Sequence, residues 1–324
     1  MQAPSGEIEP VEDPAPVTGI DAISAAAVNS HPRASEFMAE SGPVVARTQI
    51  LLDRARFSVG VINGKVTKNT ALAVHWFQKS QNLPTTSILD SATYERLLLE
   101  AGPAPAVTKI VVDQAMISGP FIVLPRSVYE QAKLRCLCYA SASEKVAERF
   151  HSTIEMMRKL NPGVAFAALR PGDSIWAPVL EPPVAAKAVK RIQVSKKGNY
   201  VHAFAADGSL VFHFPSTLGS KYDPSPTGKF RVTAVAWNPV YRYDPRLFSE
   251  VADNKPGALL PAGPNSPVGA VWIATSKAHI GIHGTPNPET IGFASSHGCV
   301  RLTNWDATRL GRAASSGIPV EFTA

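Results

Sequence analysis

Short runs of alternating apolar residues dominate the chain between residues 188 and 324. They predict β-strands, because a period of two places one set of side chains on one face of a sheet. Asp207-Gly208, between two of these runs, is typical of a hairpin turn. We therefore expect a mainly β domain over 188–324, either a sandwich or an irregular barrel. The runs lie at 191–194, 200–204, 210–214, 230–232, 271–273 and 280–282.

One helix is expected near the end of this domain. Thr303 and Asp306 form a capping pair, since the first side chain of a helix accepts a hydrogen bond from the backbone three residues later. Gly317, Ile318 and Pro319 predict its end, because glycine closes a helix readily and proline cannot continue one.

The region from residue 38 to residue 100 has a different pattern. Its apolar residues recur at the spacing of amphipathic helices, in stretches at 50–52, 71–77 and 94–98. Turn-rich pieces separate these stretches. We therefore expect a small helical bundle.

Residues 107–180 predict a smaller unit of two strands and two helices. The first strand is expected at 137–139, the helices after residues 143 and 154, and the last strand at 174–178. Asn161-Pro162-Gly163 stops the second helix, and a Pro-Gly-Asp turn at 171–173 precedes the last strand. The predicted order is strand, helix, helix, strand (βααβ).

Two proline-containing linkers, at 101–106 and 181–186, divide the chain, since proline removes backbone donors and favours extended structure. The opening residues combine prolines with acidic side chains and bury too little apolar surface to order themselves. The expected fold class is multidomain α+β. Its parts are a flexible tail over 1–37, a helical module over 38–100, a βααβ module over 107–180 and the mainly β domain over 188–324.

Length and charge narrow the classes of function. A chain of 324 residues is long enough for two or three modules with cores of their own. The formal net charge is +6, but the basic residues are scattered. We therefore expect no nucleic-acid partner, whereas an anionic polymer such as cell wall is compatible with this charge.

The sequence also bears on location. No stretch approaches the ~20 consecutive apolar residues that a membrane-spanning helix requires, so no transmembrane segment is expected. The amino terminus lacks a basic region followed by an apolar run. If the protein works in the periplasm or cell envelope, we expect its export signal to have been removed.

Three cysteines give no disulfide framework. Cys136 and Cys138 are one residue apart and would share one face of a strand. We expect both to be buried thiols, with a short strained bridge as the alternative.

The third cysteine, Cys299, has histidines near it in the sequence. A cysteine attacks a carbonyl as thiolate, and a free thiol with a pKa near ~8.5 is only slightly ionised at neutral pH. An imidazole beside the sulfur would supply the base, and neighbouring glycines would leave room for substrate. A buried structural cysteine is the alternative for Cys299 taken alone. The segments concerned are His283-Gly284-Thr285 and Ser296-His297-Gly298-Cys299-Val300-Arg301.

Together these segments resemble the signature of the L,D-transpeptidase catalytic domain (YkuD-like family), in which H-G-T is followed at this distance by S-H-G-C, a hydrophobic residue and R. Residues 224–230, P-S-P-T-G-K-F, resemble the family's P-T-P-x-G-x-F segment. Residues 261–269, P-A-G-P-N-S-P-V-G, resemble its P-G-P-N-N-P-L-G loop. The resemblance spans 188–324.

This resemblance implies a role for each motif residue. Cys299 is the nucleophile and His283 the base, with His297 and the amides of Gly298 and Cys299 around the developing oxyanion. Arg301 would hold a substrate carboxylate or the loop, and a surface salt bridge is the alternative.

The roles of the other motif residues are less well determined. Sequence alone does not decide which histidine takes the proton, because His297 is two residues from the sulfur. Ser296 would orient the imidazoles or contribute a carbonyl, or else stabilise a turn. Gly284 and Thr285 are expected at the substrate-binding edge.

The helical module resembles the peptidoglycan-binding helical repeat, with its G-x-I-D-G, threonine, alanine, F-Q and G-L pattern. Asn63 stands where aspartate is usual, and Asn82 stands where glycine is usual. Phe77 as plain core, with the polar residues as helix caps, is the alternative to a binding role.

Residues 107–180 resemble a LysM domain, a small module that grips N-acetylglucosamine polymers. The usual G-D-T turn after the first strand is replaced by A-S-A-S at 140–143. An exposed Trp176 would favour glycan binding, and a buried Trp176 would favour a structural spacer.

A zinc site is the rival interpretation of His279, His283, His297 and Cys299, which carry donors that zinc prefers. Residues 280–282 are expected to be extended, which would separate His279 from His283 by roughly 13 Å at ~3.3 Å per residue. That is too far for one ion with ligand bonds near ~2 Å. We expect neither a metal nor another cofactor.

The resemblance implies two-step acyl transfer. The Cys299 thiolate attacks the carbonyl of the third residue of a wall tetrapeptide stem, expels D-alanine and leaves a thioester. An amine of a neighbouring stem then forms a 3→3 cross-link, so peptidoglycan stem peptides and glycan are the expected partners. Water as acceptor would make the protein an L,D-carboxypeptidase, and a protein amine would make it an anchoring transferase.

Two other classes of function remain. A non-catalytic wall-binding protein would use all modules for adhesion, and the presence of both Cys299 and His283 disfavours it. A cysteine peptidase would act on general protein substrates, and the two modules that resemble wall-binding units disfavour that.

Overall fold

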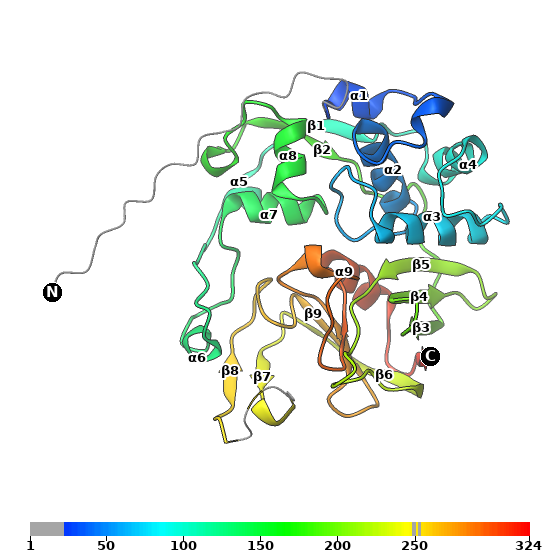
Figure 1. The fold of residues 1–324 in the computed structure, drawn as a ribbon. Coiled ribbons are helices and arrows are strands. Elements are labelled where there is room, and N and C mark those ends of the chain that lie inside the picture. The colour runs from blue at the N-terminus through cyan, green and yellow to red at the C-terminus, as the bar shows by residue number, and fades with distance from the viewer. Residues whose placement is uncertain (1–22, 248–250, 252–253) are drawn as a thin grey trace.

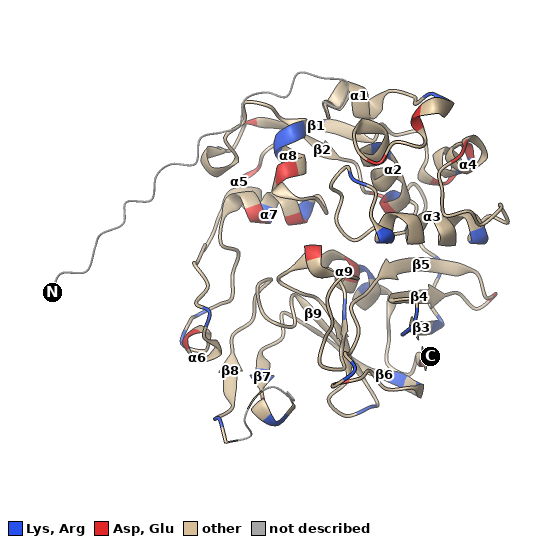
Figure 2. Cartoon of the chain, in the orientation of Figure 1, with Lys and Arg blue, Asp and Glu red and all other residues tan. Residues whose placement is uncertain are grey.

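The computed structural model describes residues 23–247, 251 and 254–324 (Figure 1). Two modules rich in helices lie above the mainly β domain in this view, and α9 (Asn304–Ala313) lies where they meet. Basic and acidic side chains are interspersed along the chain (Figure 2). Within the described ranges, no helix is long and apolar enough to cross a bilayer.

The helical module consists of α2 (Pro43–Arg54), α3 (Lys68–Ser80) and α4 (Ser91–Ala101). Ile50, Phe77 and Leu97 from the three helices are fully buried in one core. The helices lie where the apolar spacing predicted them.

The predicted tail over 1–37 is too long. α1 (Ala25–Asn29) and the 3-10 turn η1 (Ala34–Glu36) lie within it, and Val28 is fully buried. The prediction failed because Ile23, Ala25 and Val28 join the core of the helical module. Residues 1–22 lie outside the described residues.

Polar residues of the resemblance motif have structural contacts in this module. Gln49 Nε2 donates to Asn63 Oδ1 at 3.1 Å, and Gln49 Oε1 accepts from the Asn63 amide at 3.0 Å. Gln78 Nε2 donates to Thr93 Oγ1 at 3.0 Å. Asn82 has a φ of 56°, in the left-handed region that favours glycine. These side chains therefore stabilise the fold of the module.

The second module contains the two predicted helices between a pair of antiparallel strands, but two further short helices follow the first strand, so its order is not βααβ. β1 (Val107–Val111) pairs antiparallel with β2 (Ser174–Pro178), and α7 (Ala142–Arg149) and α8 (Ile154–Leu160) come between them in the chain. The first strand was predicted at 137–139, which is wrong. That segment is a loop that contacts the catalytic domain, and it follows α5 (Gln114–Ile117) and α6 (Val128–Gln131). The turn η2 (Phe166–Ala168) precedes β2.

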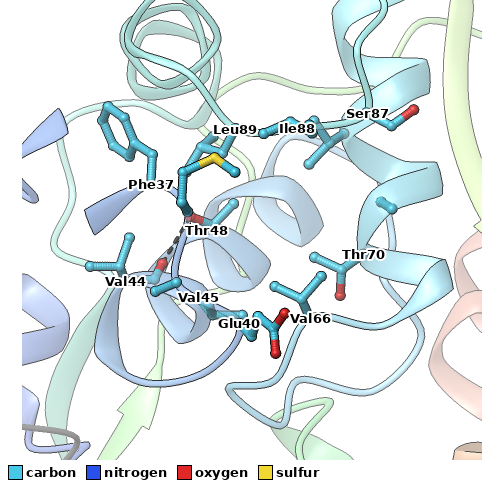
Figure 3. Close-up of a pocket in the computed structure, with 14 residues that line it drawn as sticks. Phe37, Glu40, Val44, Val45, Thr48, Val66, Thr70, Ser87, Ile88 and Leu89 are labelled. Carbon is cyan, nitrogen blue, oxygen red and sulfur yellow. Dashed lines mark hydrogen bonds between the residues drawn. The ribbon is translucent and has the colours of Figure 1, made fainter. Parts of the chain in front are cut away.

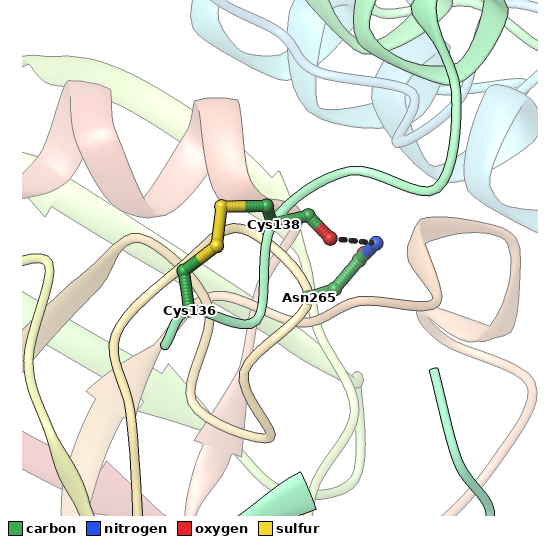
Figure 4. Close-up of a disulfide and its surroundings, with 3 residues drawn as sticks. All are labelled: Cys136, Cys138 and Asn265. Atoms are coloured by element: carbon green, nitrogen blue, oxygen red, sulfur yellow. Dashed lines mark hydrogen bonds between the residues drawn. A yellow bond between two sulfur atoms is a disulfide. The ribbon is translucent and has the colours of Figure 1, made fainter. Parts of the chain in front are cut away.

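Cys136 and Cys138 form a disulfide, so the prediction of two buried thiols is wrong. The prediction assumed a strand, whereas the loop brings the two Cα atoms to 5.3 Å, within the range of a disulfide. Leu137 between them is the fully buried residue. Figure 4 shows Asn265 Nδ2 donating to Cys138 O at 3.0 Å.

The C-terminal domain contains one eight-stranded mixed sheet, in the order β11-β10-β9-β6-β12-β3-β4-β5. All eight of these described strands are hydrogen-bonded in one sheet and not divided between two facing sheets. The arrangement is therefore closer to the irregular barrel than to the sandwich. Neither β11 nor β12 was predicted, since one has two residues and the other begins with proline. The strands are β3 (Arg191–Ser195), β4 (Tyr200–Phe204), β5 (Leu210–Pro215), β6 (Gly228–Trp237), β9 (Val271–Thr275), β10 (Gly281–His283), β11 (Val300–Arg301) and β12 (Pro319–Thr323).

A separate hairpin pairs β7 (Tyr241–Tyr243) with β8 (Ala258–Leu260). It follows β6 in the chain but is not part of the large sheet. The turns η3 (Pro245–Leu247) and η4 (Pro288–Thr290) complete the domain.

α9 begins as predicted, with Thr303 Oγ1 accepting a hydrogen bond from the Asp306 amide at 3.1 Å. The helix ends at Ala313, and Gly317, with a φ of 92°, leads into β12. Its buried Ala307 and Leu310 join the apolar core of the sheet. α9 thus packs on β9 and β10, the strand that carries His283.

The modules contact the catalytic domain through buried polar groups. Asp53 of α2 accepts hydrogen bonds from Arg309 Nη2 at 2.8 Å and from His151 Nδ1 at 3.1 Å. Ser58 Oγ donates to Asp306 Oδ2 at 2.8 Å. One carboxylate thus joins all three modules at α9.

Candidate active site

Parallel strand pairing brings the two motif segments together. Ile282 of β10 is opposite Val300 of β11, and His283 is opposite Arg301. The Leu302 amide donates to His283 O at 2.8 Å. Cys299 directly precedes β11, so the pairing places it beside β10 although sixteen positions separate it from His283 in the sequence.

The Cys299 thiol is half-buried against the start of β10. Its Sγ donates to His279 O at 3.3 Å. Burial raises the pKa of this thiol, against smaller lowering effects of the Gly281 backbone and the Arg301 charge. The resting sulfur is therefore a thiol at neutral pH.

His283 is 4% exposed and is held as one tautomer. Its Nδ1 lies 2.7 Å from Gly284 O, which can only accept, so Nδ1 carries the proton and Nε2 has a free lone pair. Burial lowers the pKa of His283 to about 3. The imidazole is therefore neutral and able to accept a proton.

Trp272 of β9, opposite His283 in the sheet, stacks on its ring. The ring centroids are 5.2 Å apart. Gly281 makes this possible, since a Cβ there would lie 2.4 Å from the indole of Trp272. The sequence predicted that glycines would leave space for substrate at the site. The space beside Gly281 is instead filled by the Trp272 indole.

Side-chain hydrogen bonds fix the turn before Cys299. Ser296 Oγ donates to Cys299 O at 2.6 Å, and Ser225 Oγ donates to Gly298 O at 2.8 Å. Gly298 has a φ of 97°, which a side chain would strain. Ser296 thus makes the contact of a turn serine, which was one of its two predicted roles. His297 lies half-buried in the same turn.

Gly284 and Thr285 lie buried at the end of β10. The Gly284 amide donates to Val271 O at 3.2 Å, and Thr285 Oγ1 accepts from the Asn287 amide at 3.3 Å. Gly284 therefore extends the pairing of β10 with β9, and Thr285 stabilises the turn that follows.

Arg301 and Tyr241 are charged or polar neighbours of the sulfur. Burial lowers the pKa of the half-buried Arg301, and the nearby Cys299 and Tyr241 oppose that shift. Burial, followed by the nearby Cys299, raises the pKa of Tyr241 to about 12. Arg301 Nε is buried without a hydrogen-bond partner among the described residues. Tyr241 was not predicted, since one tyrosine in a three-residue strand has no sequence signature.

Comparison with known proteins decides the family. The YkuD family, described as "L,D-transpeptidase catalytic domain", matches residues 189–321. A Bacillus licheniformis protein named "Putative L,D-transpeptidase YkuD" is 30% identical over 180 residues, which cover 56% of this chain and 92% of that protein. This chain belongs to the L,D-transpeptidase family. The prediction of an L,D-transpeptidase catalytic domain is confirmed.

Other proteins are similar to this L,D-transpeptidase. The protein of the same name from Bacillus subtilis is 27% identical, over 54% of this chain and 89% of its own length. The solved structure "L,D-transpeptidase from Mycobacterium smegmatis" is 20% identical, with a TM-score of 0.35 over 48% of this chain and 75% of that chain. A second family, described as "Putative peptidoglycan binding domain", matches residues 41–97. That match supports the predicted peptidoglycan-binding module.

Asn304, the first residue of α9, joins the second module to loops of this L,D-transpeptidase domain and was not predicted. Its Oδ1 accepts from the Ala270 amide at 3.0 Å, and its Nδ2 donates to Pro264 O at 3.0 Å and to Glu148 Oε1 at 3.2 Å. Burial raises the pKa of Glu148 to about 7. The only signal in the sequence was the position of Asn304 directly after the capping Thr303.

The geometry also bears on the zinc alternative. Gly281–His283 is a strand, as the distance argument assumed, and the His279 carbonyl rather than its imidazole is in contact with Cys299 Sγ. Among the residues that the structure describes, no three or more His, Cys, Asp or Glu side chains are grouped to hold a metal ion.

A second candidate site of this L,D-transpeptidase is an apolar cavity of about 210 Å³ in the helical module (Figure 3). It opens between residues 37–40, which follow η1, the start of α2, α3 and the loop at 87–89. Exposed Met38, Val66 and Ile88 line it.

Proposed function

We propose that this enzyme forms 3→3 cross-links in peptidoglycan through a thioester on Cys299, with release of D-alanine from tetrapeptide stems. The pairing of β10 with β11 carries the proposal, because it sets a neutral imidazole and a thiol on adjacent chain segments. Family membership supports the same chemistry.

The pKa directions suggest how the nucleophile is activated. The pKa of Cys299 is raised and that of His283 is lowered, so thiol and neutral imidazole coexist in the resting enzyme. As Sγ bonds to the substrate carbonyl carbon, the thiol proton moves to His283 Nε2. The same proton then goes to the amine of D-alanine as the C–N bond breaks. The His283 tautomer fixed by Gly284 supports His283 rather than His297 as the base.

The oxyanion is proposed to lie near the amides of Gly298 and Cys299, with His297 beside them. The hydrogen bonds of Ser225 and Ser296 hold this turn in one conformation before substrate binds. Such preorganised donors lower the barrier because no reorganisation is needed during the reaction.

Arg301 is proposed to bind a carboxylate of the stem peptide. Its guanidinium lies next to the sulfur in a half-buried position, and its Nε lacks a partner within the described residues. Tyr241, whose pKa is raised, stays protonated at neutral pH and is able to donate a hydrogen bond. These two groups would orient the acyl donor toward Cys299.

The preceding modules are proposed to hold the polymer near the catalytic domain, which raises the local substrate concentration. The family match at 41–97 and the apolar cavity beside α3 support binding by the helical module. We propose that the second module is LysM-like, a proposal supported by the pairing of β1 with β2, by α7 and α8 between them in the chain, and by Trp176, which is 37% exposed. A cell-wall enzyme family implies an envelope or extracytoplasmic location, and we propose the periplasm or cell envelope.

Incubation with disaccharide-tetrapeptide tests the proposal. Wild type and Cys299→Ala are compared by mass spectrometry of the products, and circular dichroism confirms that both are folded. Dimer and free D-alanine from wild type alone are the expected result. Tripeptide without dimer would indicate the L,D-carboxypeptidase, and transfer only to an added protein amine would indicate the anchoring transferase. No turnover by folded wild type that still binds wall fragments would leave the non-catalytic binding protein.

A further inference from the structure

A long loop of the second module reaches the catalytic domain. Residues 118–140, which we call the strap, leave the module after α5 and return just before α7. Figure 1 shows the strap with α6 extending down beside β8 and β7. Its two arms are joined near the module, where the Ile122 amide donates to Tyr139 O at 3.0 Å.

The far end of the strap contacts the β7–β8 hairpin directly. Tyr129 Oη donates to Pro256 O at 3.1 Å, just before β8. The Tyr129 ring meets the Tyr243 ring of β7 edge to face, with centroids 6.4 Å apart. One strap residue therefore contacts both sides of the hairpin.

The returning arm pairs with the loop that follows β8. The Leu137 amide donates to Ala262 O at 2.9 Å, and Leu137 O accepts from the Asn265 amide at 2.9 Å. Leu137 is fully buried. A Cβ on Gly263 would lie 2.1 Å from Leu137 O, so this close approach requires glycine. The Cys136–Cys138 disulfide brackets the paired residue (Figure 4).

The hairpin needs such support. Its two strands have three residues each and do not join the large sheet. An isolated two-stranded hairpin is at best marginally stable in water. Yet this hairpin carries Tyr241, which pairs with Leu260, two residues before the strap-bound Ala262. The charges of Cys299 and Arg301 act on the Tyr241 phenol, so the hairpin lies within electrostatic reach of the nucleophile.

We propose that the strap is a positioning element of the active site. Through Tyr129 and Leu137 it holds the β7–β8 hairpin in place, so that Tyr241 is in position when the acyl-donor peptide binds at Cys299. The second module is then part of the catalytic site as well as a tether to the polymer. This inference rests on the proposed function in one respect, the identity of the acyl donor.

The proposal predicts two opposite effects of loosening the hairpin. Turnover of the peptide donor falls because Tyr241 no longer helps to orient it, and KM rises. The half-buried sulfur becomes more accessible, so a small alkylating reagent reacts with it faster. A merely structural role of the strap would lower stability without this pair of effects.

The test uses the full chain with Tyr129→Ala, and Val123→Ala as the matched control on the same strap, because Val123 is 90% exposed. Steady-state kinetics with disaccharide-tetrapeptide give KM and kcat. The rate of Cys299 alkylation by iodoacetamide is measured without reductant, so that the disulfide stays closed. Tyr129→Ala is expected to raise KM at least threefold and to speed alkylation at least threefold, and Val123→Ala to match wild type.

Wild-type KM and alkylation rate in a folded Tyr129→Ala protein would overturn the proposal. Faster alkylation with unchanged KM would also overturn it, since the strap would then only cover the sulfur. If Tyr129→Ala does not fold, Tyr129→Phe removes only the hydrogen bond to Pro256 and is expected to shift both quantities in the same directions. If wild type shows no turnover, the proposed function fails, but the alkylation rates still report whether the strap holds the hairpin.

Discussion

The indole of Trp272 lies nearly parallel to the imidazole of His283, with an angle of 19° between the rings and 5.2 Å between their centroids. The contact fixes the ring plane of the proposed base, and the Nδ1 bond to Gly284 O fixes its tautomer. Stacking and hydrogen bond together aim Nε2 in one direction.

Trp272→Ala is expected to lower kcat about 10- to 100-fold, because a base displaced by about 1 Å loses catalytic efficiency on that scale. Steady-state kinetics with disaccharide-tetrapeptide measure it. Trp237→Ala is the matched control, since Trp237 is 48% exposed on β6. Equal kcat values for the two variants would show that the stacking has no role in aiming the base.

The pKa directions predict the pH dependence of thiol reactivity. The pKa of Cys299 is raised by burial, and the pKa of His283, at about 3, keeps the imidazole neutral. The rate of alkylation by iodoacetamide should therefore keep rising with pH beyond the ordinary thiol pKa of ~8.5. A rate that is constant between about pH 6 and 8 would instead reveal a thiolate–imidazolium pair and contradict the general-base mechanism.

Gly284 and Asn304 are expected to be coupled in stability. A Cβ at Gly284 would lie 2.1 Å from Asn304 Oδ1. Gly284→Ala should therefore lower the free energy of unfolding by about 1–3 kcal/mol, as overpacking does. Urea unfolding of Gly284→Ala, Asn304→Ala and the double variant measures the coupling. The double variant should lose less free energy of unfolding than the two single variants lose together. Strict additivity would show that the collision is relieved elsewhere.

A buried histidine pair beneath the helical module predicts acid sensitivity. His202 Nε2 and His213 Nδ1 are 3.0 Å apart, and burial lowers their pKa values to about 2 and about 3. Unfolded histidine has a pKa near ~6.5, so the unfolded state takes up protons first as pH falls. The contribution of these histidines to the free energy of unfolding is complete above about pH 6.5. Below that pH it falls by at most about 1.4 kcal/mol per pH unit for each histidine.

Urea unfolding between about pH 7 and 5 checks this slope. The neighbouring Lys79 and Arg191 act in the same direction on His202, and His75 acts on His213. A His202→Gln, His213→Gln protein should show a flatter pH dependence than wild type. An unchanged slope would assign the acid sensitivity to other groups.

The disulfide makes a simple prediction about thiol counts. In the folded protein without reductant, iodoacetamide should add to Cys299 alone, because Cys136 and Cys138 are bonded to each other. After denaturation and reduction with dithiothreitol, intact mass should show three additions. Three additions without reductant would mean that the strap carries free thiols.

The parts of the fold that follow from local pattern could be predicted. The strands around Asp207-Gly208, the cap of α9 at Thr303 and the helices of the first module depend on neighbours a few residues away. The pairing of Cys299 with His283 could be predicted because both residues lie in a motif that resembles a known family.

The rest depends on contacts between distant parts of the chain. Asn265 and Cys138 are 127 positions apart, and Asp53 and Arg309 are 256 apart. Neither contact has a local signature, so the strap and the docking of the modules were missed. The disulfide was only the alternative, because residues 137–139 were predicted as a strand and not as a loop. Tyr241 and Asn304 were missed for the same reason, since each acquires its role only through the loops that fold against it.

The central claim is a covalent acyl-enzyme on Cys299. Wild type and Cys299→Ala are mixed briefly with disaccharide-tetrapeptide, quenched in acid, and analysed by intact mass and by peptide mapping. The account predicts an adduct on wild type alone, located at Cys299, with the mass of the substrate less D-alanine. An adduct at another residue, or equal D-alanine release by folded Cys299→Ala, would contradict it.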